Sequence, residues 1–189
     1  MNPFDAEPSP FTYVGEELIF DGAVISLYQG EVQGPDGETF LRDVVRHPGA
    51  VAVVAVEDDH VYLVRQYRAC LNHDLWEIPA GKRDVAGEPP EVTARRELEE
   101  EVGLAAGKME LLLNVHHSPG FCDEYGYVFL ATDLTPVPQR LEGPEEQFLV
   151  TARIPLAEAC DLAMTGTITD SKSVAGLLAA ERHLANTRS

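Results

Sequence analysis

Three glutamates near the middle of the chain have the spacing that could bind a metal ion together. Glu97, Glu100 and Glu101 stand at i, i+3 and i+4, so a helix would place their carboxylates on one face. Like charges at this spacing destabilise a bare helix by a few tenths of a kcal/mol for each pair. Carboxylate oxygens are also the ligands that Mg²⁺ prefers. We therefore interpret the cluster either as a divalent-metal site or as a solvated acidic helix face.

The sequence around these glutamates predicts the helix that would position them. Pro89 and Pro90 suit a first helical turn, where the missing proline N–H has no helical partner to lose. Gly103 suits the position just after the last turn. An apolar stripe at i, i+4 and i+8 lies on another side of the helix and comprises Ala94, Leu98 and Val102. This stripe predicts that the helix packs against a core while its acidic face stays available.

The rest of the chain predicts an α+β fold with a mixed β-sheet. Segments rich in β-forming residues occupy 17–20, 23–32, 39–47, 50–56, 61–67, 109–115, 125–131 and 148–154, with a short extended piece at 76–79. Further helices are expected at 156–164 and 171–185, the second with Asp170 as its N-cap. Strands and helices do not alternate strictly, which argues against a doubly wound parallel sheet. We expect a flexible tail over 1–15, N-terminal strands over 16–47 and a main domain over 48–189.

Composition and charge narrow the class of partner. Of the 189 residues, 44% are apolar and 24% are charged, which is a normal globular mix. A net charge of −18, from 14 basic and 32 acidic residues, disfavours binding to nucleic acid or to an anionic membrane. We expect no signal peptide and no membrane span. The three widely spaced cysteines predict neither a disulfide framework nor a zinc site, so the cytoplasm is the expected location.

The acidic helix and the loop before it resemble the Nudix box of the Nudix hydrolases. The matching residues are Gly81, Glu88 and the run Arg96-Glu97-Leu98-x-Glu100-Glu101-x-Gly103-Leu104. The loop between Gly81 and Glu88 is one residue longer than is usual in the family, and a loop absorbs such a change easily. The resemblance implies the Nudix fold, in which a mixed β-sheet is sandwiched between helices, here with an N-terminal β-rich arm.

The same resemblance implies how metal would be bound. Glu97 and Glu101 would be the main ligands, Glu100 would be an auxiliary ligand or would orient water, and the backbone carbonyl of Ala80 would contribute as well. Two or three Mg²⁺ ions, with Mn²⁺ as the alternative, would bridge these groups to phosphate oxygens. The residues with structural roles in the box would be Gly81, Glu88, Arg96 and Gly103.

Segments outside the box resemble the ADP-ribose pyrophosphatase branch of the family. They are 64–68, 76–81, 118–124 and 166–172, with Pro119 sixteen residues after Gly103. The resemblance implies Mg²⁺-dependent hydrolysis of ADP-ribose to AMP and ribose 5-phosphate. A broader nucleoside diphosphate sugar pyrophosphatase is the alternative. A non-catalytic Nudix regulator that binds ADP-ribose is a minor alternative. Such regulators usually carry an extra DNA-binding domain and a degraded box, whereas this chain shows no basic domain and keeps every helix glutamate.

The branch also implies the substrate contacts. Arg68 would grip the pyrophosphate with a bidentate pair of hydrogen bonds. Arg42 would contact the nucleotide from the partner subunit, and Glu124 would bond a ribose hydroxyl. Pro119 is either a ligand contact or a residue that shapes the turn. The branch is dimeric, so we expect a homodimer in which the strands of 16–47 cross to the partner.

In this branch the general base lies outside the box, on a loop before a late strand. The corresponding loop here is 141–147, and its candidates are Glu145 and Glu146. A carboxylate on such a loop can close over the substrate and take a proton from the attacking water. Glu146 stands nearer to the following strand, so we rank it first, and Glu100 is the next candidate if neither is the base.

Overall fold

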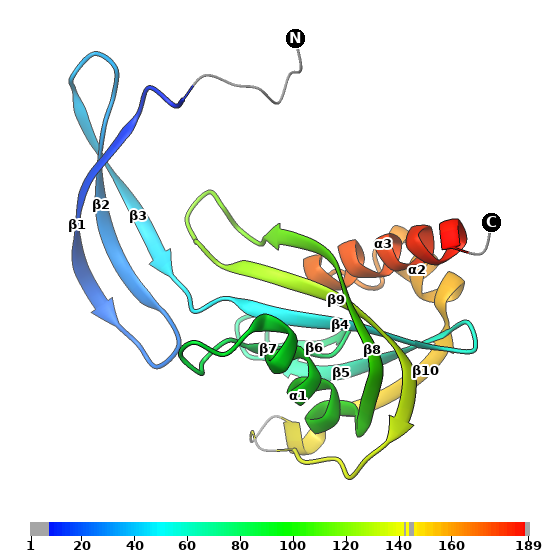
Figure 1. Cartoon of the computed structure of the whole chain (residues 1–189). Coiled ribbons are helices and arrows are strands. Elements are labelled where there is room, and N and C mark those ends of the chain that lie inside the picture. The colour runs from blue at the N-terminus through cyan, green and yellow to red at the C-terminus, as the bar shows by residue number, and fades with distance from the viewer. Residues whose placement is uncertain (1–7, 142, 144–145, 188–189) are drawn as a thin grey trace. The chain divides into compact units, whose positions relative to one another are not determined.

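The chain folds into two compact units (Figure 1). The computed structural model describes residues 8–141, 143 and 146–187. One unit lies within residues 8–48 and 118–124, and the other lies within residues 49–117 and 125–187. Each unit has its own sheet, and each is described by itself.

The first unit is a three-stranded antiparallel sheet in the order β1-β2-β3. Its strands are β1 (Thr12–Asp21), β2 (Ser26–Gln33) and β3 (Thr39–Arg46). β1 begins at Thr12, inside the segment expected to be a tail, because pairing with β2 orders it from that residue onward. Segment 118–124 joins this sheet through β3: Val45 N donates to Phe121 O at 2.7 Å, and Asp123 N donates to Val45 O at 3.1 Å.

The second unit is built on a seven-stranded mixed sheet. Five strands follow one another in the order β10-β5-β4-β9-β8, while β6 pairs with β5 and β7 pairs with β4. The β4–β9 pair is parallel and the other pairs are antiparallel. The strands are β4 (Ala50–Glu57), β5 (His60–Arg68), β6 (His73–Glu77), β7 (Ala80–Lys82), β8 (Leu104–His116), β9 (Tyr125–Pro136) and β10 (Val150–Pro155).

The central strand β4 is buried on both faces, and its alternating side chains enter two separate cores. The helices are α1 (Pro90–Val102), α2 (Leu156–Met164) and α3 (Ser171–Thr187). Val53 belongs to a buried cluster with Leu98 of α1, whereas Val54 belongs to a cluster with Cys160 of α2 and Leu177 of α3. The sheet therefore lies between α1 on one side and α2 with α3 on the other (Figure 1). This confirms the predicted α+β fold with a mixed sheet between helices.

The helix ends follow the signals in the sequence. Pro89 is extended and precedes the first residue of α1, and Gly103, with φ of 73°, ends the helix in the left-handed conformation that glycine adopts readily. At the start of α3, Asp170 Oδ2 accepts hydrogen bonds from Ser173 N at 2.9 Å and from Ser173 Oγ at 2.5 Å, which confirms the predicted N-cap. None of the helices in the described part of the chain is long and apolar enough to cross a membrane.

Candidate active site

Glu97 and Glu101 lie one helical turn apart on a buried side of α1, next to β7. Only 9% of Glu97 and 3% of Glu101 is exposed to solvent. Ala80 N donates to Glu101 Oε2 at 2.9 Å, which ties the first residue of β7 to the helix. A Cβ on Gly81 would overlap the carboxylate of Glu97, so glycine at this position lets that carboxylate lie against β7.

Burial changes the proton affinity of both carboxyl groups. It raises the pKa of Glu97 to about 7, although the neighbouring Arg96 partly offsets the effect. It raises the pKa of Glu101 to about 8, although the hydrogen bond from Ala80 N lowers this pKa and partly offsets the effect of burial. Repulsion from the Glu146 carboxylate raises both pKa values further. A cation placed between such carboxylates would favour their charged forms and lower both pKa values.

Arg96 connects the acidic face of α1 with the loop before the helix. Its Nη1 lies 2.9 Å from Glu97 Oε1 and 2.9 Å from Glu100 Oε2, and its Nη2 lies 3.7 Å from Glu88 Oε2. Glu88 also accepts a hydrogen bond from Thr93 Oγ1 at 2.7 Å. These contacts suit the structural roles expected of Arg96 and Glu88, because they hold the loop against the first turn of α1.

The donor set fits a hard divalent cation. Glu97 and Glu101 are buried carboxylates with raised pKa values, and Ala80 lies on the short strand that Glu101 holds. Among the described residues, no three acidic, histidine or cysteine side chains converge into a complete metal cage. Backbone oxygen, water and substrate oxygen would complete the coordination of such a cation.

Arg68, at the end of β5, is held by a buried acid. Its Nε and Nη2 donate to Glu77 Oε1 and Oε2, each at 2.6 Å, while 35% of the arginine side chain stays exposed. The hydrogen bond to Glu77 raises the pKa of Arg68 most, and attraction to Glu101 raises it further. Arg68 therefore lies within electrostatic range of the Glu101 carboxylate. Sequence reasoning selected Arg68 but missed Glu77, because only the folded sheet brings the two side chains together.

Glu146 belongs to the same acidic group. It is the first residue of the short 3-10 helix η1 (Glu146–Phe148), which precedes β10, and its Oε2 accepts a hydrogen bond from Gly143 N at 3.0 Å. Gln139, ahead of this loop, donates from Nε2 to the backbone oxygen of Glu101 at 2.5 Å and so anchors the loop to α1. Glu145, the other candidate base, lies outside the described residues.

The remaining predicted substrate residues lie in the first unit. Arg42, on β3, places its guanidinium carbon 4.3 Å from the centre of the Phe40 ring. Pro119 and Glu124 lie in segment 118–124, which turns through a hydrogen bond from Phe121 N to Ser118 O at 3.1 Å. The structure thus groups Arg42, Pro119 and Glu124 in one unit. It groups Ala80, Arg68, Glu146 and the glutamates of α1 in the other.

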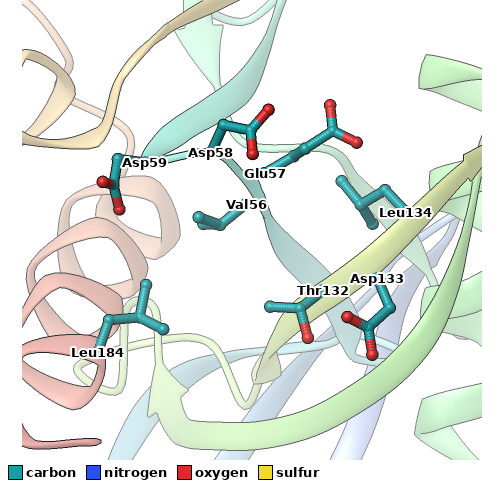
Figure 2. A pocket seen from close by; sticks show the side chains of 8 residues that line it. All are labelled: Val56, Glu57, Asp58, Asp59, Thr132, Asp133, Leu134 and Leu184. Atoms are coloured by element: carbon teal, nitrogen blue, oxygen red, sulfur yellow. The ribbon is translucent and has the colours of Figure 1, made fainter. Parts of the chain in front are cut away.

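A hollow elsewhere in the second unit is also acidic, but it lacks the geometry of a metal site (Figure 2). It is lined by Val56, Glu57, Asp58, Asp59, Thr132, Asp133, Leu134 and Leu184. Its four carboxylates do not converge on one point (Figure 2). Arg153 lies 3.7 Å from Glu57 and 3.5 Å from Asp58, and Lys108 lies 3.3 Å from Asp133. This hollow is therefore a weaker candidate for a metal site than the buried glutamates of α1.

Comparison with known proteins identifies the family of the chain. Residues 45–176 match the family model of the NUDIX domain. The chain belongs to the Nudix family. Over 170 residues this Nudix chain is 42% identical to the ADP-ribose pyrophosphatase of Mycobacterium tuberculosis, covering 89% of this chain and 82% of that protein. Over 161 residues it is 42% identical to the ADP-ribose pyrophosphatase of Bacillus subtilis, covering 85% and 86% respectively.

A solved structure confirms the Nudix fold. The crystal structure of an ADP compounds hydrolase matches this Nudix chain with a TM-score of 0.82, covering 97% of this chain and 98% of that one. The two sequences are 24% identical. The sheet and its covering helices therefore follow the Nudix arrangement that the box residues predicted.

Proposed function

We propose that this protein hydrolyses the pyrophosphate bond of ADP-ribose to AMP and ribose 5-phosphate. The observation that carries the proposal is the buried pair Glu97 and Glu101, with Arg68 within electrostatic range of the pair. A diphosphate needs both a cation site and a fixed guanidinium, and this face offers both. Two relatives at 42% identity are named ADP-ribose pyrophosphatase, which supports ADP-ribose as the substrate.

The cofactor in this proposal is Mg²⁺, with Mn²⁺ as the alternative. Glu97, Glu101 and the carbonyl of Ala80 would hold it, and Glu100 would be an auxiliary ligand. When bound, two or three such ions would polarise the phosphate oxygens and lower the pKa of a water molecule.

The side chains of the chain itself would bind the substrate and move the proton. Arg68 would use the N–H groups that face away from Glu77 to hold the pyrophosphate. The carboxylate of Glu146 would accept a proton from the attacking water as the water oxygen bonds to phosphorus. The bridging P–O bond then breaks, and the two phosphate monoesters leave as products. Glu145 is the second candidate for the base.

The functional form in this proposal is a homodimer. Several large apolar side chains of β1 are 45–58% exposed, namely Tyr13, Val14, Leu18, Ile19 and Phe20. Exposed apolar side chains on a thin sheet suit coverage by another protein surface, and a second copy of this chain is the partner that we propose. In the dimer, the nucleotide and ribose would be contacted by Arg42, Glu124 and Pro119.

The proposed location is the cytoplasm. The three cysteines of the chain are free thiols, which suits a reducing compartment.

The test is a hydrolysis panel with the purified protein. ADP-ribose, ADP-glucose, GDP-mannose, NADH and diadenosine polyphosphates are each incubated with Mg²⁺ or Mn²⁺, and products are separated by chromatography. We expect AMP and ribose 5-phosphate from ADP-ribose, with kcat/KM at least about tenfold above that for the other substrates. Equal turnover of several sugars would instead assign the broader pyrophosphatase. Binding of ADP-ribose without turnover would assign the regulator.

A further inference from the structure

Lys172, the second residue of α3, is a largely buried cation held by two carboxylates. Its Nζ lies 2.6 Å from Asp170 Oδ1 and 2.7 Å from Glu77 Oε2, and only 14% of its side chain is exposed. Burial lowers the pKa of Lys172, but attraction to Asp170 and Glu77 outweighs this and raises the pKa above its usual value. The lysine is therefore charged at neutral pH, and burying that charge requires both partners.

Glu77 is shared between Lys172 and Arg68. Its side chain is 1% exposed, and its two oxygens accept from Nε and Nη2 of Arg68 in a bidentate pair. Lys172 Nζ donates to the Oε2 atom that also accepts from Nη2 of Arg68. The group thus contains two cations and, with Asp170, two carboxylates. A bidentate pair fixes the plane of the guanidinium, so whatever fixes Glu77 also fixes Arg68.

The start of α3 holds the backbone beside Glu77 as well. Ile78 N donates to Ser173 Oγ at 2.9 Å, and Ala80 N donates to Glu101 at 2.9 Å. The segment 77–80 is therefore tied to α3 at one end and to α1 at the other. Of these contacts, only the one from Lys172 brings a positive charge to the segment. Ser173 contributes a neutral hydroxyl group, and Glu101 belongs to α1.

We propose that Lys172 is a positioning residue for the substrate's pyrophosphate, and that it acts through Glu77 by keeping Arg68 in place and its charge available. The inference rests on the proposed function. Without Lys172, the group keeps two carboxylates against one cation. Glu77 would lose one of its two anchors, and the surplus negative charge would offset the charge of Arg68 and repel a diphosphate. Loss of Lys172 should therefore weaken substrate binding more than it slows the chemical step.

A double-mutant cycle on ADP-ribose hydrolysis tests this. Lys172→Met should raise KM about tenfold and change kcat less than about threefold, because a charge is lost beside the binding group rather than at the reacting atoms. In an Arg68→Ala background, the same change should lower kcat/KM by less than about twofold. Lys108→Met, at an exposed lysine paired with Asp133, is the matched control and should leave both constants near the wild-type values.

Lys172→Gln is the second variant, since it keeps a hydrogen-bond donor and removes the charge. If Lys172→Met fails to fold, Lys172→Gln should still raise KM. A lower Tm with unchanged KM in the folded variant would overturn the proposal. So would independent effects of Lys172 and Arg68 on kcat/KM, because both outcomes describe a merely structural lysine.

The wild-type protein is assayed first, because absence of ADP-ribose hydrolysis refutes the proposed function and not the role of Lys172. In that case the same cycle is run on ADP-ribose binding, measured by calorimetry. A tenfold weaker Kd for Lys172→Met that disappears in the Arg68→Ala background supports the positioning role. An unchanged Kd refutes it.

Discussion

The carboxylate of Glu97 lies against the backbone of Gly81, in the space that a Cβ at position 81 would occupy. This relationship explains why the short strand β7 and the helix α1 can share one site. The backbone of β7 supplies Ala80 and Gly81, and α1 supplies the two buried glutamates. The close approach depends on a missing side chain, so it can be tested with a single methyl group.

Gly81→Ala should displace the Glu97 carboxylate while leaving the fold largely intact. The atoms in the way belong to the end of a flexible side chain, so the added methyl group can be absorbed by moving them. We expect kcat to fall at least about tenfold, because a metal ligand is moved, and Tm to fall by only a few degrees. Steady-state kinetics and calorimetry check this. Gly15→Ala is the control, since nothing lies within 4 Å of a Cβ there.

Metal-free protein should lose stability as the pH rises. The folded-state pKa of Glu97 is about 7 and that of Glu101 is about 8, both above the ordinary 4.5. Between pH 4.5 and about pH 8 the folded protein holds protons that the unfolded chain has released. The free energy of unfolding therefore falls as the pH rises through this range. A cation binds the deprotonated pair, so the rise in Tm caused by Mg²⁺ should be larger at pH 8 than at pH 6.

Thermal unfolding in EDTA and in Mg²⁺ over this pH range measures the effect. Glu101→Gln is the comparison variant, because it removes the group with the higher pKa and should flatten the dependence. A Mg²⁺ effect of equal size at pH 6 and pH 8 would contradict the assignment of these carboxylates to the metal site.

Glu146→Gln should lower kcat by roughly 10²–10⁴, the range usual for loss of a general base. The Kd for substrate should change less than about tenfold, since Arg68 and the metal site stay intact. Glu145→Gln is measured beside it, by single-turnover kinetics and calorimetry. If Glu145→Gln is the inactive variant, the general base lies on the predicted loop but is Glu145 and not Glu146. If both variants turn over normally, the base lies elsewhere, with Glu100 the next candidate.

Sedimentation should give a mass twice that of the 20.7 kDa chain. Leu18→Glu, which puts a charge on the exposed apolar side of β1, should shift the protein toward the monomer and lower kcat/KM about tenfold or more. Glu17→Gln is the control, because neighbouring residues of a strand point to opposite faces. A fully active wild-type monomer would refute the proposed dimer.

The sequence predicted the elements whose signals are local. The box helix was placed by Pro89, Pro90 and Gly103, and α2 was placed at 156–164, because a helical period and terminal residues leave a direct trace in the chain. The strand 23–32 was predicted too early, since Gly22 to Ile25 form the turn between β1 and β2. β8 and β9 were predicted too short, because their mutual pairing extends them beyond their most β-prone residues.

Residue spacing alone predicted the part of the candidate site whose residues are close in sequence, and the family resemblance supplied Ala80, Arg68 and Glu146. A helix is sufficient to place Glu97, Glu100 and Glu101 on one face, because they are spaced at i, i+3 and i+4. Lys172 and Glu77 are separated by 95 residues, and neither type nor spacing indicates that they share a buried ion pair. Such a pair arises when α3 packs on the sheet, which is a tertiary event that a single sequence leaves open.

The metal site on α1 is tested most directly by ADP-ribose turnover of Glu97→Gln and Glu101→Gln, measured against Glu99→Gln at saturating Mg²⁺. Glu97 and Glu101 are buried on the side of α1 that faces β7, whereas Glu99 is exposed, so the three variants make the same chemical change on different faces of one helix. We expect Glu97→Gln and Glu101→Gln each to lower kcat by at least about 10², and Glu99→Gln to keep wild-type turnover. Near wild-type kcat in either Glu97→Gln or Glu101→Gln would contradict the metal site on α1.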